Sequence, residues 1–166
     1  MEQRRIAQFL PVSAEQLRVD WEKALPGVGL PGSVRLPGRA TAGSAGDDFY
    51  SLTDFSLRPN ESILLPTGVR ARMEEGWALL LFPRSGLGFR YRLQLNNTVG
   101  VIDADYFHAK NEGHILLKLT NDSREGKTLT VREGDAVAQG IFIPFGVTED
   151  DDASGARTGG FGSTDR

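Results

Sequence analysis

Short runs of apolar residues, rather than long helical stripes, dominate the hydrophobic pattern of this chain. Apolar residues alternate with arginines from Val69 to Met73, as expected for a strand with one buried face. Residues 77–82 form a continuous apolar run, which predicts a strand covered on both faces. Further short runs continue to residue 145, with turn signals roughly every ten residues, as is typical of sandwiches and barrels. This rhythm predicts an all-β domain.

The N-terminal part of the chain has a different pattern. Residues 5–12 predict a first strand. Ser13 has the character of a helix N-cap, and Gln16 stands three residues later, as in a capping box. We therefore predict one amphipathic helix at about residues 13–25, with its tryptophan in the core or in an interface, followed by an irregular crossing loop over residues 26–40. Three apolar residues carry the helical spacing: Leu17, Trp21 and Leu25.

Composition narrows the possible functions. The 166 residues suit a single domain, which we place at residues 1–148, with a mobile C-terminal arm at residues 149–166. A net charge of -3 argues against binding to nucleic acid, which favours basic surfaces. With no cysteine and only two histidines, any metal is expected to be a hard cation held by oxygen ligands. We see no signal peptide or membrane span, and we expect a cytoplasmic protein.

Five stretches carry residues suited to chemistry rather than to packing. They are Ala42–Phe49, Pro83–Gly88, Gly100–Tyr106, Gly134–Gln139 and Arg157–Thr164. The first joins small residues to two acids, and the third ends an apolar run with Asp-x-Asp-Tyr. The second combines an arginine, a serine and glycine amides, which together suit phosphate oxygens. The last is a glycine-rich tail that can wrap a ligand and become ordered on binding.

Each stretch, taken alone, has a simpler interpretation. Asp-x-Asp-Tyr is compatible with a β-turn, because aspartate side chains bond to nearby backbone amides. Arg-Ser-Gly and Gly-Asp are also common in turns. The tail is the hardest to explain as ordinary structure, because its glycines cannot add to a core, whereas its phenylalanine can stack on a ligand.

In this order, the five stretches closely resemble the five motifs of the trimeric dUTPase family. The match runs from about Ala42 to Thr164, and its most specific parts are Pro-Arg-Ser-Gly-Leu-Gly, Gly-Val-Ile-Asp-x-Asp-Tyr and Gly-Gly-Phe-Gly-Ser-Thr. The resemblance implies an all-β fold, a distorted jelly-roll β-barrel with one short N-terminal helix and a flexible C-terminal arm. It also implies a homotrimer whose active sites draw on all three subunits, and Mg²⁺-dependent hydrolysis of dUTP to dUMP and pyrophosphate.

The resemblance assigns roles to residues around the base and the sugar. Asp103 is expected to hold the 3′-hydroxyl and to activate the water that attacks the α-phosphorus. Tyr106 is expected to pack beneath the deoxyribose and to leave no room for a 2′-hydroxyl. The hairpin between Leu95 and Asp103 is expected to receive the uracil. The groups expected to recognise the base are the side chain of Asn97 and the backbone of Gly100, Val101 and Ile102.

The resemblance also assigns the phosphate and metal contacts. Asp48 matches the acid that reaches Mg²⁺ through water, while Phe161 is expected to close over the uracil. The triphosphate-binding positions in the body of the chain are Arg84, Ser85, Gly86 and Gln139. Those in the arm are Arg157, Gly162, Ser163 and Thr164.

Four positions depart from the family pattern. Residues 107–113 form an insertion of about five residues next to the site, a possible lip or subunit contact, in which we expect His108 to be a surface residue. Ala136 stands where the family commonly has arginine, so one ion pair or phosphate contact is lost or supplied elsewhere. Arg157 lies one residue closer to the glycine-rich motif than usual. Asp165 replaces the usual glycine and adds negative charge near the γ-phosphate.

Three other functions are compatible with parts of the pattern. A dCTP deaminase, including its bifunctional form, shares the fold and the Arg-Ser stretch but needs an acid–base glutamate, for which Glu112 is the least unsuitable candidate. A nucleotide-sensing, partner-binding protein on the same scaffold would explain the insertion and the additional helix. A jelly-roll lectin would leave Arg84, Gln139 and the arm without a use.

Overall fold

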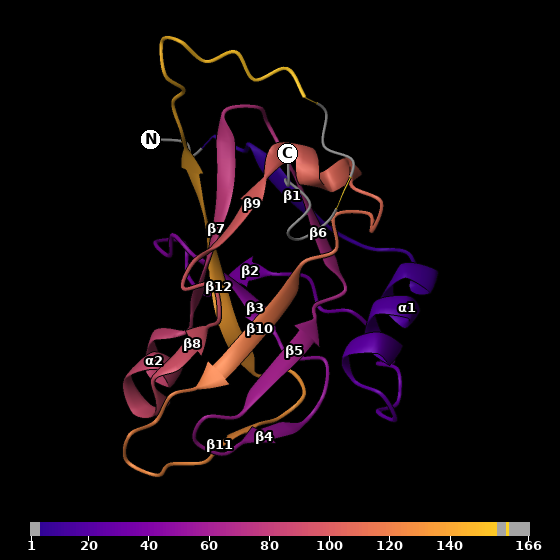
Figure 1. The fold of residues 1–166 in the computed structure, drawn as a ribbon, viewed down its shortest axis with the longest axis vertical. Coiled ribbons are helices and arrows are strands. Elements are labelled where there is room, and N and C mark those ends of the chain that lie inside the picture. Colours follow the sequence, from indigo (N-terminus) through magenta and orange to yellow (C-terminus); the bar gives the residue numbers. More distant parts are fainter. Residues whose placement is uncertain (1–3, 156–158, 160–166) are drawn as a thin grey trace.

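Strands account for most of the regular structure over residues 4–155 and 159, the part of the chain that the computed structural model describes. In chain order the elements are β1 (Ala7–Pro11), α1 (Ala14–Ala24), β2 (Gly38–Arg39), β3 (Asp47–Tyr50), β4 (Phe55–Leu57), β5 (Ser62–Pro66), β6 (Val69–Met73), β7 (Trp77–Pro83), α2 (Ser85–Tyr91), β8 (Leu93–Leu95), β9 (Gly100–Asp103), the 3-10 helix η1 (Ala104–His108), β10 (Leu116–Asn121), β11 (Leu129–Val131) and β12 (Ala136–Pro144) (Figure 1). The fold is therefore mostly β, as predicted, but with two α-helices where we expected one.

The strands pair in antiparallel fashion to form four sheets. The largest has the order β2-β3-β12-β7-β9, so β12 lies between β3 and β7. A second sheet has the order β5-β10-β8, and two further pairs are β1-β6 and β11-β4. Over the described residues no strand pairing closes these sheets into one continuous barrel. The mostly β class is thus confirmed, whereas the jelly-roll barrel stays a prediction.

The core is formed by the apolar faces of these strands, as the sequence pattern predicts. In β6, Val69, Ala71 and Met73 are buried, while the half-buried Arg70 and the exposed Arg72 lie on the opposite face. At the centre of the largest sheet the packing leaves no room for a side chain at Gly140. A Cβ there would lie 2.8 Å from Leu79 and 2.9 Å from Phe49. This close packing fixes β12, β7 and β3 against one another.

Helix α1 begins and ends where the pattern predicts, but its cap differs from the expectation. Ser13 Oγ accepts a hydrogen bond from the backbone N–H of Gln16 (3.1 Å), and Trp21 is buried in the core. The return bond of a capping box is absent from this N-cap: the backbone N–H of Ser13 donates to Glu112 (2.8 Å), and the Gln16 side chain donates to Asp20 (2.8 Å). A residue of the insertion therefore completes the helix cap.

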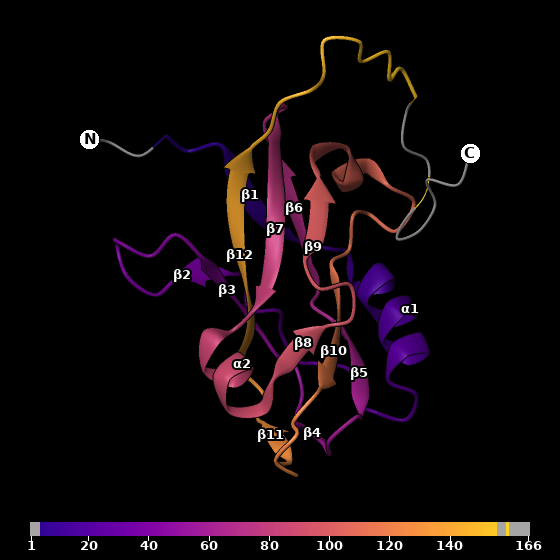
Figure 2. The same ribbon diagram turned by 60° about the vertical axis from the view of Figure 1, so that its left-hand side comes forward.

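Helix α2 was not predicted, because its sequence disfavours a helix. It contains Gly86 and Gly88, and glycine costs about 1 kcal/mol relative to alanine inside a helix. It is seven residues long and ends at Arg92, which adopts the left-handed conformation (φ 51°). In the structure α2 caps one end of β7, whereas η1 lies near the other end (Figure 2). Tertiary packing decides this helix rather than local propensity.

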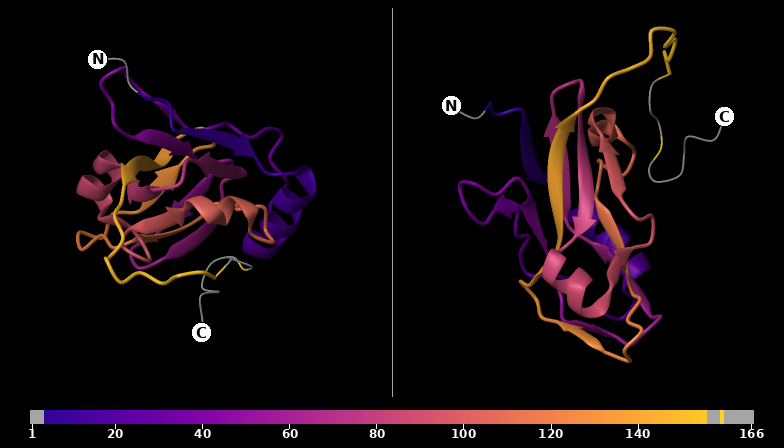
Figure 3. Two further views of the ribbon diagram at one scale, coloured as in Figure 1. Left: turned by 90° about the horizontal axis from the view of Figure 1, so that it is seen from above. Right: turned by 90° about the vertical axis from the view of Figure 1, so that its left-hand side faces the viewer.

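Helix α1 and residues 145–155 lie on different sides of the molecule. Viewed from above, α1 stands at the margin of the molecule (Figure 3, left), and residues 145–155 leave β12 and run beyond the end of its sheet (Figure 3, right). Residues 144–155 are exposed throughout. None of the described helices has the length and apolar character needed to cross a bilayer.

Candidate active site

Three of the five motifs meet at the α2 end of the largest sheet. Gln139 on β12 is the register partner of Asp48 on β3 and of Phe82 on β7, so their side chains leave the same face. Arg84 follows Phe82 by two positions and returns to this face. Arg84 Nη1 donates to Asp48 Oδ1 (2.5 Å), and Gln139 Nε2 donates to the carbonyl of Pro83 (3.3 Å). The sheet register therefore assembles what the sequence places far apart.

The ion pair of this end is open to solvent on one side only. The side chain of Asp48 is 11% exposed and that of Arg84 is 40% exposed. A guanidinium carries five N–H donors, and the bond to Asp48 uses one of them. The aspartate thus holds the arginine in place, and the partly exposed guanidinium has further donors with which an anion can be bound. Burial raises the pKa of the adjacent Asp47, an effect that Arg39 opposes and the Asp48 charge reinforces.

Ser85 and Gly86, predicted as a phosphate loop, form the first turn of α2. Both are exposed. The first backbone N–H groups of a helix have no partner within the helix, which suits them to bind anionic oxygens. Arg84 and Ser85 help to line a pocket of about 400 Å³, with Phe89 on its rim 91% exposed. Two of the four triphosphate residues predicted in the body of the chain therefore line a cavity.

The third motif lies at the opposite end of β7. Asp103 ends β9 and is the register partner of Ala78, near the start of β7. A pocket of about 510 Å³ lies here, and Asp103, Asp105 and His108 are among the residues that line it. His108 is exposed, which confirms the expected surface position, and its ring packs edge-on against Phe107.

The two ends are too far apart for one chain to bring them to the same phosphate. Arg84 follows Ala78, the partner of Asp103, by six residues, which corresponds to roughly 20 Å at about 3.3 Å per strand residue. Within one chain the structure thus brings together Asp48, Arg84 and Gln139, but it does not bring Asp103 to them.

Asn97 lies in a turn rather than in the hairpin that we expected. Strand β8 pairs with β10, and β9 pairs with β7, so residues 96–99 join strands of different sheets. The turn is tight: Thr98 N–H donates to Leu95 O (2.8 Å), and Thr98 has a φ of 67°. Asn97 is exposed at the tip of this turn. The expectation of a hairpin was wrong because each strand pairs with a neighbour from a distant part of the chain.

Tyr106 is buried, and its hydroxyl is held from the insertion. The hydroxyl donates to the backbone carbonyl of His114 (2.7 Å) and accepts from Asn111 Nδ2 (2.8 Å). Our sequence reasoning missed Asn111 and His114. The only signal available was that a short insertion so close to a motif contained polar residues.

Two other expectations concern Glu112 and Ala136. Glu112 accepts from both the hydroxyl and the backbone N–H of Ser13, and these bonds lower its pKa. It therefore favours the ionised form, which makes it unsuited to donate a proton as a deaminase requires. Ala136 is the register partner of Tyr50. The guanidinium of Arg35 stacks on the Tyr50 ring, with its carbon 3.5 Å from the ring centroid. A guanidinium thus lies near the position where the family commonly has arginine.

The arm residues of the fifth motif cannot be placed. Arg157, Phe161, Gly162, Ser163 and Thr164, as well as Asp165, lie outside the described residues.

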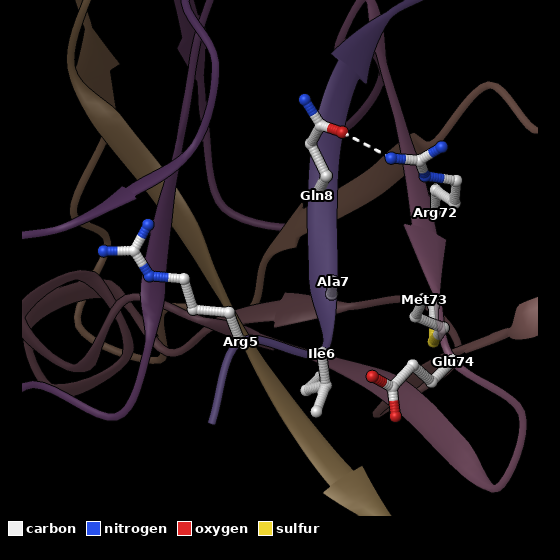
Figure 4. Close-up of a pocket in the computed structure, with 7 residues that line it drawn as sticks. All are labelled: Arg5, Ile6, Ala7, Gln8, Arg72, Met73 and Glu74. Atoms are coloured by element: carbon white, nitrogen blue, oxygen red, sulfur yellow. Dashed lines mark hydrogen bonds between the residues drawn. The ribbon is translucent and has the colours of Figure 1, made fainter. Parts of the chain in front are cut away.

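A pocket of about 560 Å³ also lies where β1 runs beside β6 (Figure 4). Arg72 donates to Gln8 across this pair of strands (2.7 Å). The residues that line the pocket come from outside the five motifs, so we do not include it in the candidate site.

The carboxylate oxygens of Asp48 suit the hard cation that the sequence predicts. Among the described residues, no group of three acidic or histidine side chains is arranged to hold a metal. Mg²⁺ usually keeps several waters and binds through one or two carboxylates together with substrate phosphates. A single carboxylate held beside an arginine therefore suits a hard cation that keeps most of its water ligands.

Comparison with known proteins agrees with these motifs. The dUTPase family model matches residues 33–165. A deoxyuridine 5′-triphosphate nucleotidohydrolase of Lactococcus lactis subsp. lactis (strain IL1403) is 40% identical over 134 residues, which cover 79% of this chain and 88% of that protein. The enzyme of the same name from Hahella chejuensis (strain KCTC 2396) is 37% identical over 143 residues, covering 81% and 90%.

Solved structures show the same similarity. The crystal structure of a dUTPase from Streptococcus mutans superposes with a TM-score of 0.63 at 33% identity, and the match covers 85% of this chain and 98% of that one. A dUTPase mutant from phage phi11 of S. aureus, described with a structural Mg(II) ion, gives a TM-score of 0.64 at 22% identity, covering 91% and 98%. At this lower identity the second match supports only a similarity of fold.

Proposed function

Because this chain belongs to the dUTPase family, we propose that it hydrolyses dUTP to dUMP and pyrophosphate by attack of water on the α-phosphorus. It is a dUTP diphosphatase. The reaction removes dUTP before a polymerase can use it, which keeps uracil out of DNA, and it supplies dUMP. The observation that carries the proposed site is the convergence of Asp48, Arg84 and Gln139 at one end of β7, with Asp103 at the other.

Asp103 is our proposed catalytic residue. It is half-buried in a pocket, where a carboxylate can hold a sugar hydroxyl and accept a proton from a water within hydrogen-bond reach. Holding both groups on one side chain would fix the attacking water relative to the α-phosphorus.

We propose that β9 recognises the uracil base. This strand is the last in the order β2-β3-β12-β7-β9, so one row of its backbone groups faces away from β7. The backbone of Gly100, Val101 and Ile102 then offers alternating N–H and C=O groups that fit uracil and mismatch cytosine. Asn97 adds a side-chain amide from the exposed turn before β9.

Tyr106 is proposed to exclude ribonucleotides. A buried ring held by two hydrogen bonds presents a fixed surface to the sugar. A 2′-hydroxyl pressed against it would be both crowded and deprived of water.

The triphosphate is proposed to bind at the α2 end through Arg84, Ser85, Gly86 and Gln139. The arginine supplies charged donors and the start of α2 supplies amides. Asp48 would hold Mg²⁺ through water. The ion, when bound with substrate, neutralises phosphate charge.

We propose a homotrimer, because one chain leaves its two half-sites roughly 20 Å apart along β7. A neighbouring subunit can place its own Asp103 and Tyr106 opposite Arg84. The proposed arm, residues 149–166, would then close the site, with Phe161 over the uracil and with Arg157, Gly162, Ser163 and Thr164 on the phosphates. Residues 1–148 would form one domain, and its sheets the distorted jelly-roll barrel of the family. We place the enzyme in the cytoplasm, where its nucleotide substrate is used.

The test is pyrophosphate release with Mg²⁺ from dUTP, dCTP, dTTP and UTP, measured in parallel. The proposal expects turnover of dUTP alone. Ammonia release from dCTP would establish the deaminase instead. Tight binding of dUTP without turnover, together with a protein partner recovered in pull-downs, would favour a nucleotide-sensing protein instead.

A further inference from the structure

A network of hydrogen bonds connects α1 with the insertion and ends at the hydroxyl of Tyr106. Its members come from three segments that are far apart in the sequence: α1 with its N-cap, the turn before β6, and residues 106–114. The network lies outside the five motifs, apart from Tyr106 itself.

At the centre of the network the Tyr106 hydroxyl uses both its donor and its acceptor capacity. It donates to His114 O (2.7 Å) and accepts from Asn111 Nδ2 (2.8 Å). The amide of Asn111 is itself oriented, because its Oδ1 accepts from the backbone N–H of Gly113 (3.3 Å). A Cβ at Gly113, where φ is 71°, would lie 2.6 Å from the carbonyl oxygen of Tyr106. The insertion is therefore packed directly onto the tyrosine backbone.

The His114 side chain anchors this turn to the rest of the protein. It is fully buried, and its Nε2 lies 2.8 Å from the backbone N–H of Gly68, which donates to it. Nε2 must therefore carry a lone pair, so the proton sits on Nδ1 and is donated to Asp20 Oδ2 (2.6 Å). One tautomer satisfies both contacts, which fixes the orientation of the ring.

Helix α1 and its N-cap hold residues 112–114 at two points. Asp20 binds His114, and Ser13 at the N-cap binds Glu112 through its hydroxyl (2.6 Å) and its backbone N–H (2.8 Å). Ser13 and Asp20 are seven residues apart, which is about two helical turns, so both face the same side of the helix. The helix is thus a two-point clamp on the segment that holds Tyr106.

We propose that Asp20, Asn111 and His114 are positioning residues that fix the Tyr106 ring and thereby set the preference of the site for deoxyribose over ribose. This inference rests on the proposed placement of Tyr106 beneath the sugar. A ring that can retreat by a fraction of an ångström leaves room for a 2′-hydroxyl. Rejection of one extra hydroxyl by shape is worth about 10²-fold, so loosening the ring should remove a measurable part of it.

The experiment compares kcat and KM for dUTP and UTP in the full-length protein. Asn111→Ala removes the bond to the tyrosine, and Asp20→Leu removes the acceptor of His114, whereas Asp20→Asn keeps a carbonyl oxygen there. Lys110→Ala, on the exposed side of the same insertion, is the matched control. We expect Asn111→Ala and Asp20→Leu to lower the dUTP/UTP ratio of kcat/KM on the order of tenfold. That loss should arise mainly from better use of UTP, and Asp20→Asn and Lys110→Ala should keep the wild-type ratio.

Two further measurements separate this inference from the proposed function. Tyr106→Ala tests the placement of the tyrosine: an unchanged ratio would contradict the proposed function itself. If Tyr106→Ala changes the ratio and Asn111→Ala does not, the positioning role is wrong although the proposed function stands.

Nitrogen NMR of the His108→Gln protein provides a readout independent of turnover, because only His114 then remains. We expect the tautomer with the proton on Nδ1 in this protein, and the same tautomer when Asp20→Asn is added. A proton on Nε2 would overturn the network. If Asp20→Leu does not fold, Asn111→Ala and the NMR measurement still decide the question.

Discussion

At the α2 end of β7 the protein holds a charged pair beside solvent, whereas at the η1 end it holds a tyrosine within a buried hydrogen-bond network. The first is built by strand register: Asp48 and Arg84 come from neighbours of β12, and the arginine remains 40% exposed. The second depends on an insertion and a helix outside the sheets. In the proposed site, the phosphates would therefore meet a partly exposed charge, whereas the sugar would meet a side chain fixed by buried hydrogen bonds.

The largest effect is expected at the η1 end from Asp103→Asn. The amide keeps the shape of the side chain but cannot accept a proton, so kcat for dUTP should fall by about 10²- to 10⁴-fold with little change in substrate affinity. The control is Asp105→Asn, which removes an equal charge from the lining of the same pocket. Equal losses in both variants would mean that the pocket charge, rather than a base at Asp103, matters.

At the α2 end, Arg84→Ala should lower kcat/KM for dUTP on the order of 10²-fold, because it removes charged donors from the phosphates. Arg84→Lys should recover only part of this loss, since an ammonium lacks the planar fork that binds Asp48 and phosphate together. The dUTP/UTP ratio should stay unchanged in both variants. A change in that ratio would show that the two ends do not act separately.

The buried network should also be visible in the pH dependence of stability. Burial lowers the pKa of His114 below 6.5, while hydrogen bonding to Asp20 and the charge of Glu112 oppose this shift. The unfolded state then takes up the proton first, so stability should be complete above pH 6.5 and should decrease as the pH falls below it. Chemical unfolding between pH 6.5 and 4.5 should therefore show a shallower dependence in His114→Gln than in wild type.

The exposed His108→Gln is the matched control for that measurement and should retain the wild-type dependence. Glu112 has a pKa held below 4.5, so its contribution is lost only at lower pH. Protonation of Asp47, whose pKa is raised by burial, acts in the opposite direction in both variants. Identical pH profiles for His114→Gln and wild type would contradict the neutral, buried histidine.

The smallest effect is expected from Ser13→Ala, which removes the N-cap hydroxyl of α1. Loss of such a cap typically costs about 1 kcal/mol of unfolding free energy, and here the same hydroxyl also binds Glu112. Thermal or urea unfolding would measure it. Ser56→Ala, an exposed hydroxyl bonded to Thr130 in the sheet pair β4-β11, is a comparison outside α1. Its unfolding free energy should change less, and a larger loss there would contradict the clamp.

Local patterns predicted much of the fold and of the motif residues. Alternation gave the outward arginines of β6, and Ser13 marked the start of α1, because both signals lie within a few residues of the element they specify. Helix α2 was not predicted, because its glycines disfavour a helix. The contact of Asp20 with His114 joins residues 94 apart, which no local pattern encodes. The separation of Asp103 from Arg84 needed the register of β7 with β9.

The central claim is that the two ends of β7 serve one site only across different subunits. It is tested most directly by mixing Arg84→Ala subunits with Asp103→Asn subunits, after unfolding and refolding them together. Neither variant alone should turn over dUTP appreciably. In randomly mixed trimers about a quarter of the sites would combine an intact Arg84 with an intact Asp103, so about a quarter of the wild-type activity should return. A mixture that forms mixed trimers, shown by mass spectrometry, and yet stays inactive would contradict the account.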